Sequence, residues 1–328
     1  MNVRVGTSGW SYPEGRGTWN GVFYPPRGTR GFRAGDELSY YAEHFDTVEV
    51  NSTFYRQPSA PTTARWVAQT PAVFEFSVKL YQAFTHVTLI GRGPLSDRTP
   101  RPASALPRPA PGEADLFMAG IDPIAANGKL GAVLAQFPPG FHCSPESLDY
   151  VAGLLETLRD YPVAVELRHR SWSDAGTTTA EVLGRFQAAW VQIDEPKFRL
   201  SIRQDLVPNI ERFSYMRLHG RNAAQWWSPE APEDRYNYLY SREELQPFAT
   251  AASVGRSDVR KAYLYLNNHF AAKAVVNAAV LKHELGQRVT GEYRPEMLDA
   301  YPELRDIVPP SSVPTDHRQS RLFSVSSD

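Results

Sequence analysis

The sequence has only one cysteine, Cys143, among its 328 residues, so the chain cannot form an internal disulfide. This absence fits a reducing compartment, and because the N-terminus lacks the pattern of a secretory signal peptide, we expect a cytoplasmic protein. No apolar run approaches the ~20 residues that a membrane-spanning helix needs, so we expect no membrane partner. The net charge of −1 provides no general attraction to nucleic acid.

The sequence does contain a regular alternation of strand and helix patterns. Alternating apolar and polar side chains predict eight strands, at residues 3–7, 46–51, 74–79, 131–136, 163–169, 189–194, 214–219 and 262–267. Helical spacing occurs between most of them, at residues 34–45, 61–69, 114–126, 145–159, 176–187, 241–256 and 271–285. This order predicts an α/β fold, a closed parallel TIM (β/α)8 barrel in a single domain. The alternative, an open doubly wound sheet, would need a glycine-rich turn that residues 6–9 do not provide.

The fifth strand pattern, residues 163–169, divides its side chains unusually. Valine and leucine fall on one face, whereas Glu166 and Arg168 fall on the other. If helices cover this strand, both charges face an interior, where they are costly unless they are paired or used for chemistry. His169 is ambiguous, because regular alternation points it outward and only a turn beginning there would bring it inward.

Other strand patterns also end in polar residues on the inward parity. The polar residues expected at the C-terminal end of the barrel are Ser8, Glu49, Asn51, Lys79, Gln136, Glu166, Arg168, Asp194, Arg217, His219, Asn267 and His269. Barrel interiors are usually filled by aliphatic side chains, and catalytic groups lie at this end. The concurrence of so many polar groups therefore predicts a functional pocket rather than a set of structural ion pairs.

These side chains support three kinds of chemistry. Lys79, Arg168 and Arg217 could clamp an anionic substrate. A divalent metal such as Mn²⁺, Mg²⁺ or Zn²⁺ could be held by Glu49, Glu166, Asp194, His219 and His269. The chain has no His-Glu-x-x-His motif and no cysteine cluster, so metal binding stays one alternative among the three. A pair of carboxylates could instead carry out acid–base or glycosidic chemistry.

Roles within the pocket follow from these chemistries. We expect catalysis by Glu49, Glu166, Asp194 and His219. We expect the amides of Asn51, Gln136 and Asn267 to contact the substrate. Trp10 and Tyr55 belong to aromatic-rich loops above the pocket, where flat side chains either stack on bases or sugars or pack the loops onto the barrel rim.

Six motifs along the chain resemble those of the YecE-like family, also called domain-of-unknown-function family 72. They are Val5-Gly-Thr-Ser-Gly-Trp-Ser-Tyr12, Thr47-Val-Glu-Val-Asn-Ser-Thr-Phe-Tyr-Arg56, Gln136-Phe-Pro-Pro139, Ala164-Val-Glu-Leu-Arg-His169, Arg217-Leu-His-Gly-Arg-Asn222 and Leu266-Asn-Asn-His269. The resemblance covers roughly residues 3–285 and implies a barrel of the triosephosphate isomerase type without a settled activity. The family's motif residues fall on Glu49, Asn51, Glu166, Arg168, His169, His219 and Asn267.

The resemblance also suggests the domain boundaries. We expect one YecE-like barrel domain at residues 1–308 and a polar tail at 309–328. A proline-rich stretch at 91–113, between the third and fourth strands, is expected to be an insertion loop outside the family pattern.

The first functional hypothesis is an enzyme that hydrolyses a phosphoester or another anionic substrate, with nucleic acid among the candidates. In this hypothesis Lys79, Arg168 and Arg217 hold phosphate. Its analogy with metal-dependent barrels such as endonuclease IV rests on the fold alone. Two alternatives belong to other classes: a metal-free lyase or isomerase acting on a sugar or carboxylate, and a non-catalytic barrel that binds nucleic acid or another ligand.

Overall fold

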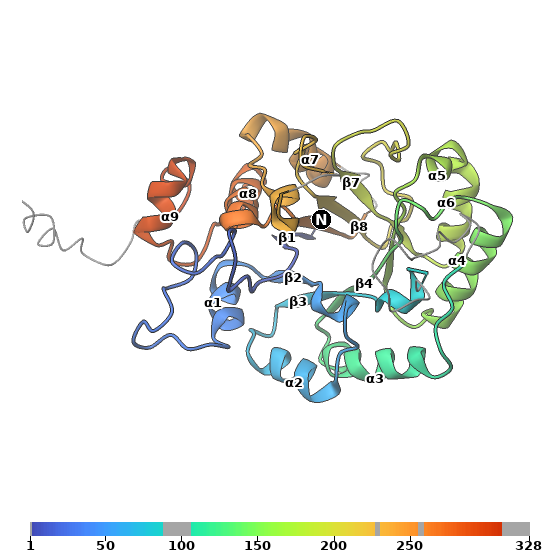
Figure 1. The fold of residues 1–328 in the computed structure, drawn as a ribbon, viewed down its shortest axis with the longest axis horizontal. Helices are drawn as coiled ribbons and strands as arrows, with labels where there is room; N and C mark the ends of the chain where they lie inside the picture. Colours follow the sequence, from blue (N-terminus) through green and yellow to red (C-terminus); the bar gives the residue numbers. More distant parts are fainter. Residues whose placement is uncertain (1, 88–105, 227–229, 255–258, 310–328) are drawn as a thin grey trace, which may run out of the picture.

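The computed structural model describes residues 2–87, 106–226, 230–254 and 259–309. Within these ranges nine parallel strands form two sheets, in the orders β1-β9-β8-β7 and β2-β3-β4-β5-β6. The strands are β1 (Asn2–Thr7), β2 (Thr47–Val50), β3 (Glu75–Lys79), β4 (Leu130–Gln136), β5 (Val163–Glu166), β6 (Ala189–Trp190), β7 (Gln192–Asp194), β8 (Ser214–Leu218) and β9 (Lys261–Leu266). Together they make a nearly closed barrel with helices around it, as Figure 1 shows, which confirms the predicted TIM-like fold.

The helices lie between the strands along the chain. They are α1 (Glu37–His44), α2 (Ala60–Ala68), α3 (Glu113–Ala126), α4 (Pro145–Thr157), α5 (Arg170–Asp174), α6 (Gly176–Arg185), α7 (Arg242–Val254), α8 (Lys273–Glu284) and α9 (Pro295–Ala300). All seven predicted helices are present, with ends shifted by a few residues, whereas the short α5 and α9 were not predicted. The start of α4 shows how the local sequence determines where a helix begins. The Ser144 side chain accepts a hydrogen bond from the Ser147 backbone N–H, and Pro145 occupies the first turn.

The two sheets meet where β1 approaches β2. A side chain at Gly6 would place its Cβ only 2.3 Å from the backbone oxygen of Thr47, so only glycine allows this approach. Just above, Ser8 forms a parallel bridge with Glu49, and the Gly9 N–H donates to the Glu49 carbonyl oxygen at 2.7 Å. This junction fixes Glu49 at the C-terminal mouth of the barrel.

The barrel interior is polar through its depth. Near the N-terminal ends of the strands, Glu75 binds Arg4, Lys261 and the Tyr263 hydroxyl. In the middle, the Tyr265 hydroxyl lies within hydrogen-bond distance of Thr47 and Ser77, at 2.6 and 2.9 Å. The strand alternation therefore predicted the inward face correctly, because these residues share the parity of the expected pocket residues.

The predicted strand at 189–194 is interrupted at Val191, so it appears as β6 and β7. The proline-rich insertion lies largely in residues 88–105 and the polar tail almost wholly in 310–328, outside the described residues. No helix of the described segments is long and apolar enough to cross a membrane.

Candidate functional site

Arg217 of β8 organises the C-terminal end of the barrel. Its Nε and Nη2 donate to the two carboxylate oxygens of Glu49, at 2.9 and 2.7 Å. Its Nη1 donates to Glu166 Oε2 at 2.5 Å and to Gln136 Oε1 at 2.9 Å. The Tyr215 hydroxyl adds a 2.7 Å bond to Glu49. Four strands, β2, β4, β5 and β8, thus contribute to one buried hydrogen-bonded network.

The charges of this network are almost fully removed from water. Arg217 is 1% exposed and Glu49 and Glu166 are 0% exposed. Burial acts to lower the pKa of Arg217, but Glu166 and Glu49 outweigh it and raise that pKa. Burial acts to raise the pKa of Glu166, but Arg217, His219 and Arg168 hold it well below its usual range. Arg217 and Glu166 therefore stay ionised, and the one guanidinium of Arg217 is shared by the carboxyl groups of Glu49 and Glu166.

Next to this network, three buried polar atoms have no hydrogen-bond partner within the part of the chain that the structure describes: Glu166 Oε1, Arg168 Nε and His219 Nε2. Glu166 Oε1 lies 3.5 Å from Arg168 Nε and 3.7 Å from His219 Nε2. These separations are too long for good hydrogen bonds. Buried polar groups are nearly always satisfied, so three of them converging on one point indicate a place for a bound polar group.

His219 has a defined tautomer at this point. Asn267 Nδ2 donates to His219 Nδ1 at 2.8 Å, which leaves the ring proton on Nε2. Burial and the neighbouring Arg217 lower the pKa of His219 to about 3. His219 is therefore a neutral donor at physiological pH, and it faces the carboxylate acceptor of Glu166.

Lys79 lies at the end of β3, and its ammonium group has few contacts that stabilise its positive charge. Its Nζ is 4.2 Å from the centroid of the Phe54 ring, and the described residues offer it no hydrogen bond or ion pair. Burial, together with Arg217 and Arg168, lowers the pKa of Lys79 to about 7, against the opposing effect of Glu166 and Glu49. An amine that titrates near neutral pH can act as a general base or acid.

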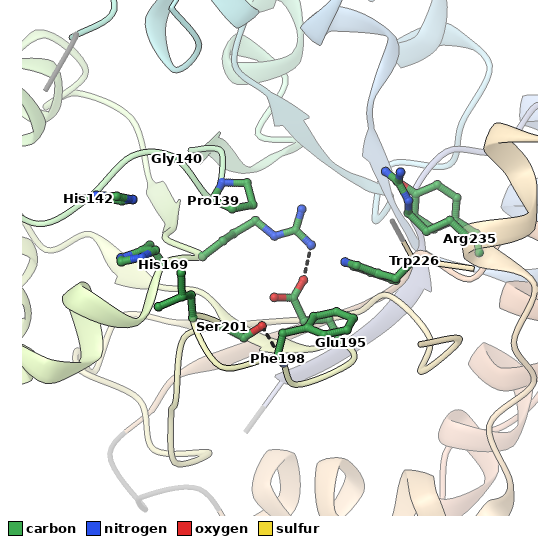
Figure 2. A pocket seen from close by; sticks show the side chains of 12 residues that line it. Pro139, Gly140, His142, His169, Glu195, Phe198, Ser201, Trp226 and Arg235 are labelled. Carbon is green, nitrogen blue, oxygen red and sulfur yellow. Dashed lines mark hydrogen bonds and ion pairs between the residues drawn. The ribbon is translucent and has the colours of Figure 1, made fainter. Parts of the chain in front are cut away.

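A cavity of about 380 Å³ opens beside these residues, and we call it the outer chamber. It is lined by loop residues that follow β4, β5, β7 and β8: Pro139, Gly140, His142, Arg168, His169, Glu195, Phe198, Leu200, Ser201, Trp226, Arg235 and Tyr236. Figure 2 shows His142 and His169 on one side of it, with Trp226 and Arg235 on the other. Arg168 belongs both to this lining and to the inner group of unpartnered atoms, so its side chain borders both regions.

Several lining residues were not among the predicted site residues. Glu195 forms an ion pair with Arg168. Burial acts to lower the pKa of Arg168, but the nearby Glu195 and Glu166 outweigh it and raise that pKa. Glu195 follows β7 directly, so only its position beside Asp194 could have indicated a role. His142 lies in a loop and Arg235 in the 3-10 helix Pro232–Tyr236, and strand parity makes no prediction for either. The ambiguous His169 does line the chamber, because β5 ends at Glu166 and α5 begins just after His169.

Two predicted site residues, Asp194 and His269, have their side chains engaged outside this network. Asp194 binds Arg221 through both oxygens, at 2.8 and 3.0 Å, and accepts a 2.7 Å bond from the Tyr240 hydroxyl. His269 stacks on Tyr12 with ring centroids 4.2 Å apart, and burial lowers its pKa to about 4.

The two predicted loop aromatics, Trp10 and Tyr55, differ in how far they are packed against the barrel. Trp10 packs edge-to-face against Trp66 of α2, which is the rim-packing role that the sequence left open. Tyr55 is 73% exposed and contacts Phe54. The Tyr55 side chain is therefore available to solvent, and the Phe54 ring that it contacts also carries the Lys79 amine over its face.

The donor set does not fit a divalent metal. Both oxygens of Glu49 are bound by Arg217, and both oxygens of Asp194 are bound by Arg221. Across the described ranges, no group of three or more His, Cys, Asp or Glu side chains is arranged to hold a metal ion. A metal at Glu166 would also lie beside the Arg168 and Arg217 cations, which oppose its charge.

Comparison with known proteins agrees with the fold. Residues 4–299 match the model of a family described as "Protein of unknown function DUF72". The chain is 26% identical over 310 residues to the UPF0759 protein YunF of Bacillus subtilis, covering 91% of this chain and 100% of that protein. A DUF72 family structure from Thermotoga maritima is 31% identical with a TM-score of 0.69, covering 88% of this chain and 100% of that one. One from Enterococcus faecalis is similar in fold, with a TM-score of 0.70 at 23% identity, covering 87% and 95%.

Proposed function

Because this chain belongs to the DUF72 family, whose description assigns no activity, we propose its function from the pocket itself: a metal-free isomerase or lyase that moves a proton beside the carbonyl of a small, sugar-like substrate. The observation that carries this proposal is the convergence of Glu166 Oε1, Arg168 Nε and His219 Nε2, all buried and unpartnered. One acceptor beside two donors matches a hydroxyl group next to a carbonyl oxygen.

The chemistry follows from the protonation states. The substrate hydroxyl donates to Glu166 Oε1, while the carbonyl oxygen accepts from His219 Nε2–H and Arg168 Nε–H. The uncharged amine of Lys79 takes the proton from the carbon beside the carbonyl, and the C–H electrons move to the carbonyl oxygen to form an enediolate. Donors already oriented toward that oxygen stabilise its developing charge. In an isomerisation, the Lys79 ammonium returns its proton to the former carbonyl carbon, while the hydroxyl proton passes through Glu166 Oε1 to the former carbonyl oxygen. In an elimination, the enediolate electrons re-form the carbonyl and expel a leaving group from the next carbon, and that group takes the proton from Lys79.

Phosphoester hydrolysis has less support. Arg217 already binds two carboxylates and Arg168 binds Glu195, so neither guanidinium is free to clamp a phosphate at full strength. The outer chamber, at about 380 Å³, is at the small end of ligand sites, which run to roughly 1,000 Å³. Its size favours a small molecule over a polymer such as nucleic acid.

Proton transfer to and from carbon can be measured without knowing the product. Aldoses, ketoses, sugar acids and their phosphates, incubated with the protein in D₂O, are expected to gain deuterium beside the carbonyl, as followed by NMR. The rate should rise as pH increases through about 7, because only the uncharged Lys79 amine accepts a proton. Lys79→Met should lower the rate by about 10²- to 10⁴-fold, the usual contribution of a general base.

A second lysine provides a matched control. Lys273 also lies over a phenylalanine ring, with Nζ 5.8 Å from the centroid of Phe270. Lys273→Met should leave the exchange rate unchanged. Absence of exchange across the whole panel, or an unchanged rate in folded Lys79→Met, would contradict the proposal.

A further inference from the structure

The outer chamber carries more positive than negative charge. Among the described residues that line it, Glu195 is the one carboxylate, and Arg168 already forms an ion pair with it. Arg235 adds a second guanidinium, for which the described part of the chain provides no ion-pair partner. Two histidines, His142 and His169, add ring N–H donors. A cavity with this balance favours an anion over a neutral or cationic ligand.

The Arg235 guanidinium packs on an aromatic ring, but its hydrogen-bond donors are not all paired within the described residues. Its guanidinium carbon lies 5.9 Å from the ring centroid of Trp226, a cation–π contact that fixes its direction. Its Nε is buried, and the described residues offer it no hydrogen-bond partner. The neighbouring Asp234 is turned to Arg16, at 3.3 Å, and to the Ala231 N–H, at 3.0 Å. A buried donor without a partner is unfavourable, and a planar guanidinium suits a two-oxygen acceptor.

The opposite wall of the outer chamber is formed by two stacked imidazole rings. The rings of His142 and His169 stack with centroids 3.8 Å apart. The Ser171 N–H donates to His169 Nδ1 at 3.2 Å, which leaves the ring proton on Nε2. Burial and the neighbouring His142 lower the pKa of His169, so this ring stays neutral near pH 7. Figure 2 shows this pair across the chamber from Trp226 and Arg235.

From this arrangement we infer that the substrate carries an oxyanion, either a phosphate or a carboxylate, that binds in the outer chamber through Arg235 while its hydroxylated end reaches Glu166. The substrate class is then a small anionic sugar, either a sugar phosphate or a sugar acid. This inference rests on the proposed function for the hydroxylated end, whereas the oxyanion end can be tested by binding alone.

Calorimetric titration of the full chain measures the contribution of the oxyanion to binding separately from that of the hydroxylated end. The probes are inorganic phosphate, a sugar phosphate, the corresponding sugar acid and the uncharged parent sugar. Arg235→Gln should raise the Kd of the sugar phosphate or the sugar acid by at least about tenfold, the value of one charge-assisted contact. The Kd of the uncharged sugar should not change. Whichever anion depends on Arg235 more strongly identifies the oxyanion.

The matched control is Arg185→Gln, because Arg185 also lies over an aromatic ring, at 5.5 Å from the centroid of Phe186, and does not line the chamber. It should leave every Kd unchanged. Equal affinity of wild type and Arg235→Gln for both anions would overturn the inference, as would tighter binding of the uncharged sugar. Arg235-dependent binding without proton exchange would sustain this inference and count against the proposed function alone.

Discussion

Replacing Arg217 with methionine is expected to lower the free energy of unfolding by about 3–5 kcal/mol, the usual cost of removing one partner from a buried ion pair. The reason is that Glu49 and Glu166, both fully buried, would lose the guanidinium that bonds to each of them. Two uncompensated carboxylates would then lie in the barrel, next to Gln136 and Tyr215. Urea or thermal unfolding measures the change.

A combined variant tests whether the charges cause this loss. Adding Glu49→Gln and Glu166→Gln to Arg217→Met removes the buried charges together, and neutral replacements of buried ion pairs are often close to neutral in stability. The triple variant should therefore regain most of the lost stability. A loss below about 1 kcal/mol for Arg217→Met alone would mean that the network does not stabilise the barrel, since even an ordinary hydrogen bond contributes that much.

Glu166→Gln is expected to reduce proton exchange by about 10²-fold or more, the effect of losing one group that orients the reaction. Its amide can place an N–H where Oε1 now accepts, facing the His219 N–H, so the substrate hydroxyl loses its acceptor. Stability should fall less than in Arg217→Met, because Arg217 retains both bonds to Glu49 and the new amide oxygen can still accept from Arg217 Nη1. The exchange assay and a melting curve of the same sample measure both effects.

Glu75→Gln is the matched control for this variant. Glu75 is also a buried glutamate in the barrel, bound by Arg4, Lys261 and Tyr263, but it lies at the N-terminal ends of the strands. It should lose stability and keep the exchange rate. Unfolding of Glu166→Gln, or an unchanged rate in it, would make Glu166 a structural counter-ion.

Most of the fold could be predicted from the sequence because the strands alternate so regularly. The parity that puts Glu166 inward also puts Glu49 and Arg217 inward, and all three meet in the structure. The break at Val191 was not predictable, because neighbouring strands rather than the local sequence decide where pairing stops. The short α5 was missed since five residues are too few for a helical period to be recognised.

The site was predictable only as far as the strands extend. Alternation cannot show which charges neutralise each other, so Asp194, bonded to Arg221 in the structure, looked equivalent to Glu166. Beyond the strand ends the direction of a side chain depends on loop conformation. For this reason two residues of the outer chamber were missed. Glu195 supplies the counter-ion of Arg168, and Arg235 supplies a cation for which the described residues offer no ion-pair partner.

The most direct test of the central claim is an experimental structure with a non-reactive polyol phosphate bound, at a resolution that shows ordered oxygens. The account predicts one ligand oxygen within hydrogen-bond distance of Glu166 Oε1 and a second near His219 Nε2 and Arg168 Nε, with the phosphate on Arg235. The contradicting result would be direct, short hydrogen bonds from Arg168 and His219 to Glu166 with no oxygen between them, because the three atoms would then satisfy one another and hold no substrate.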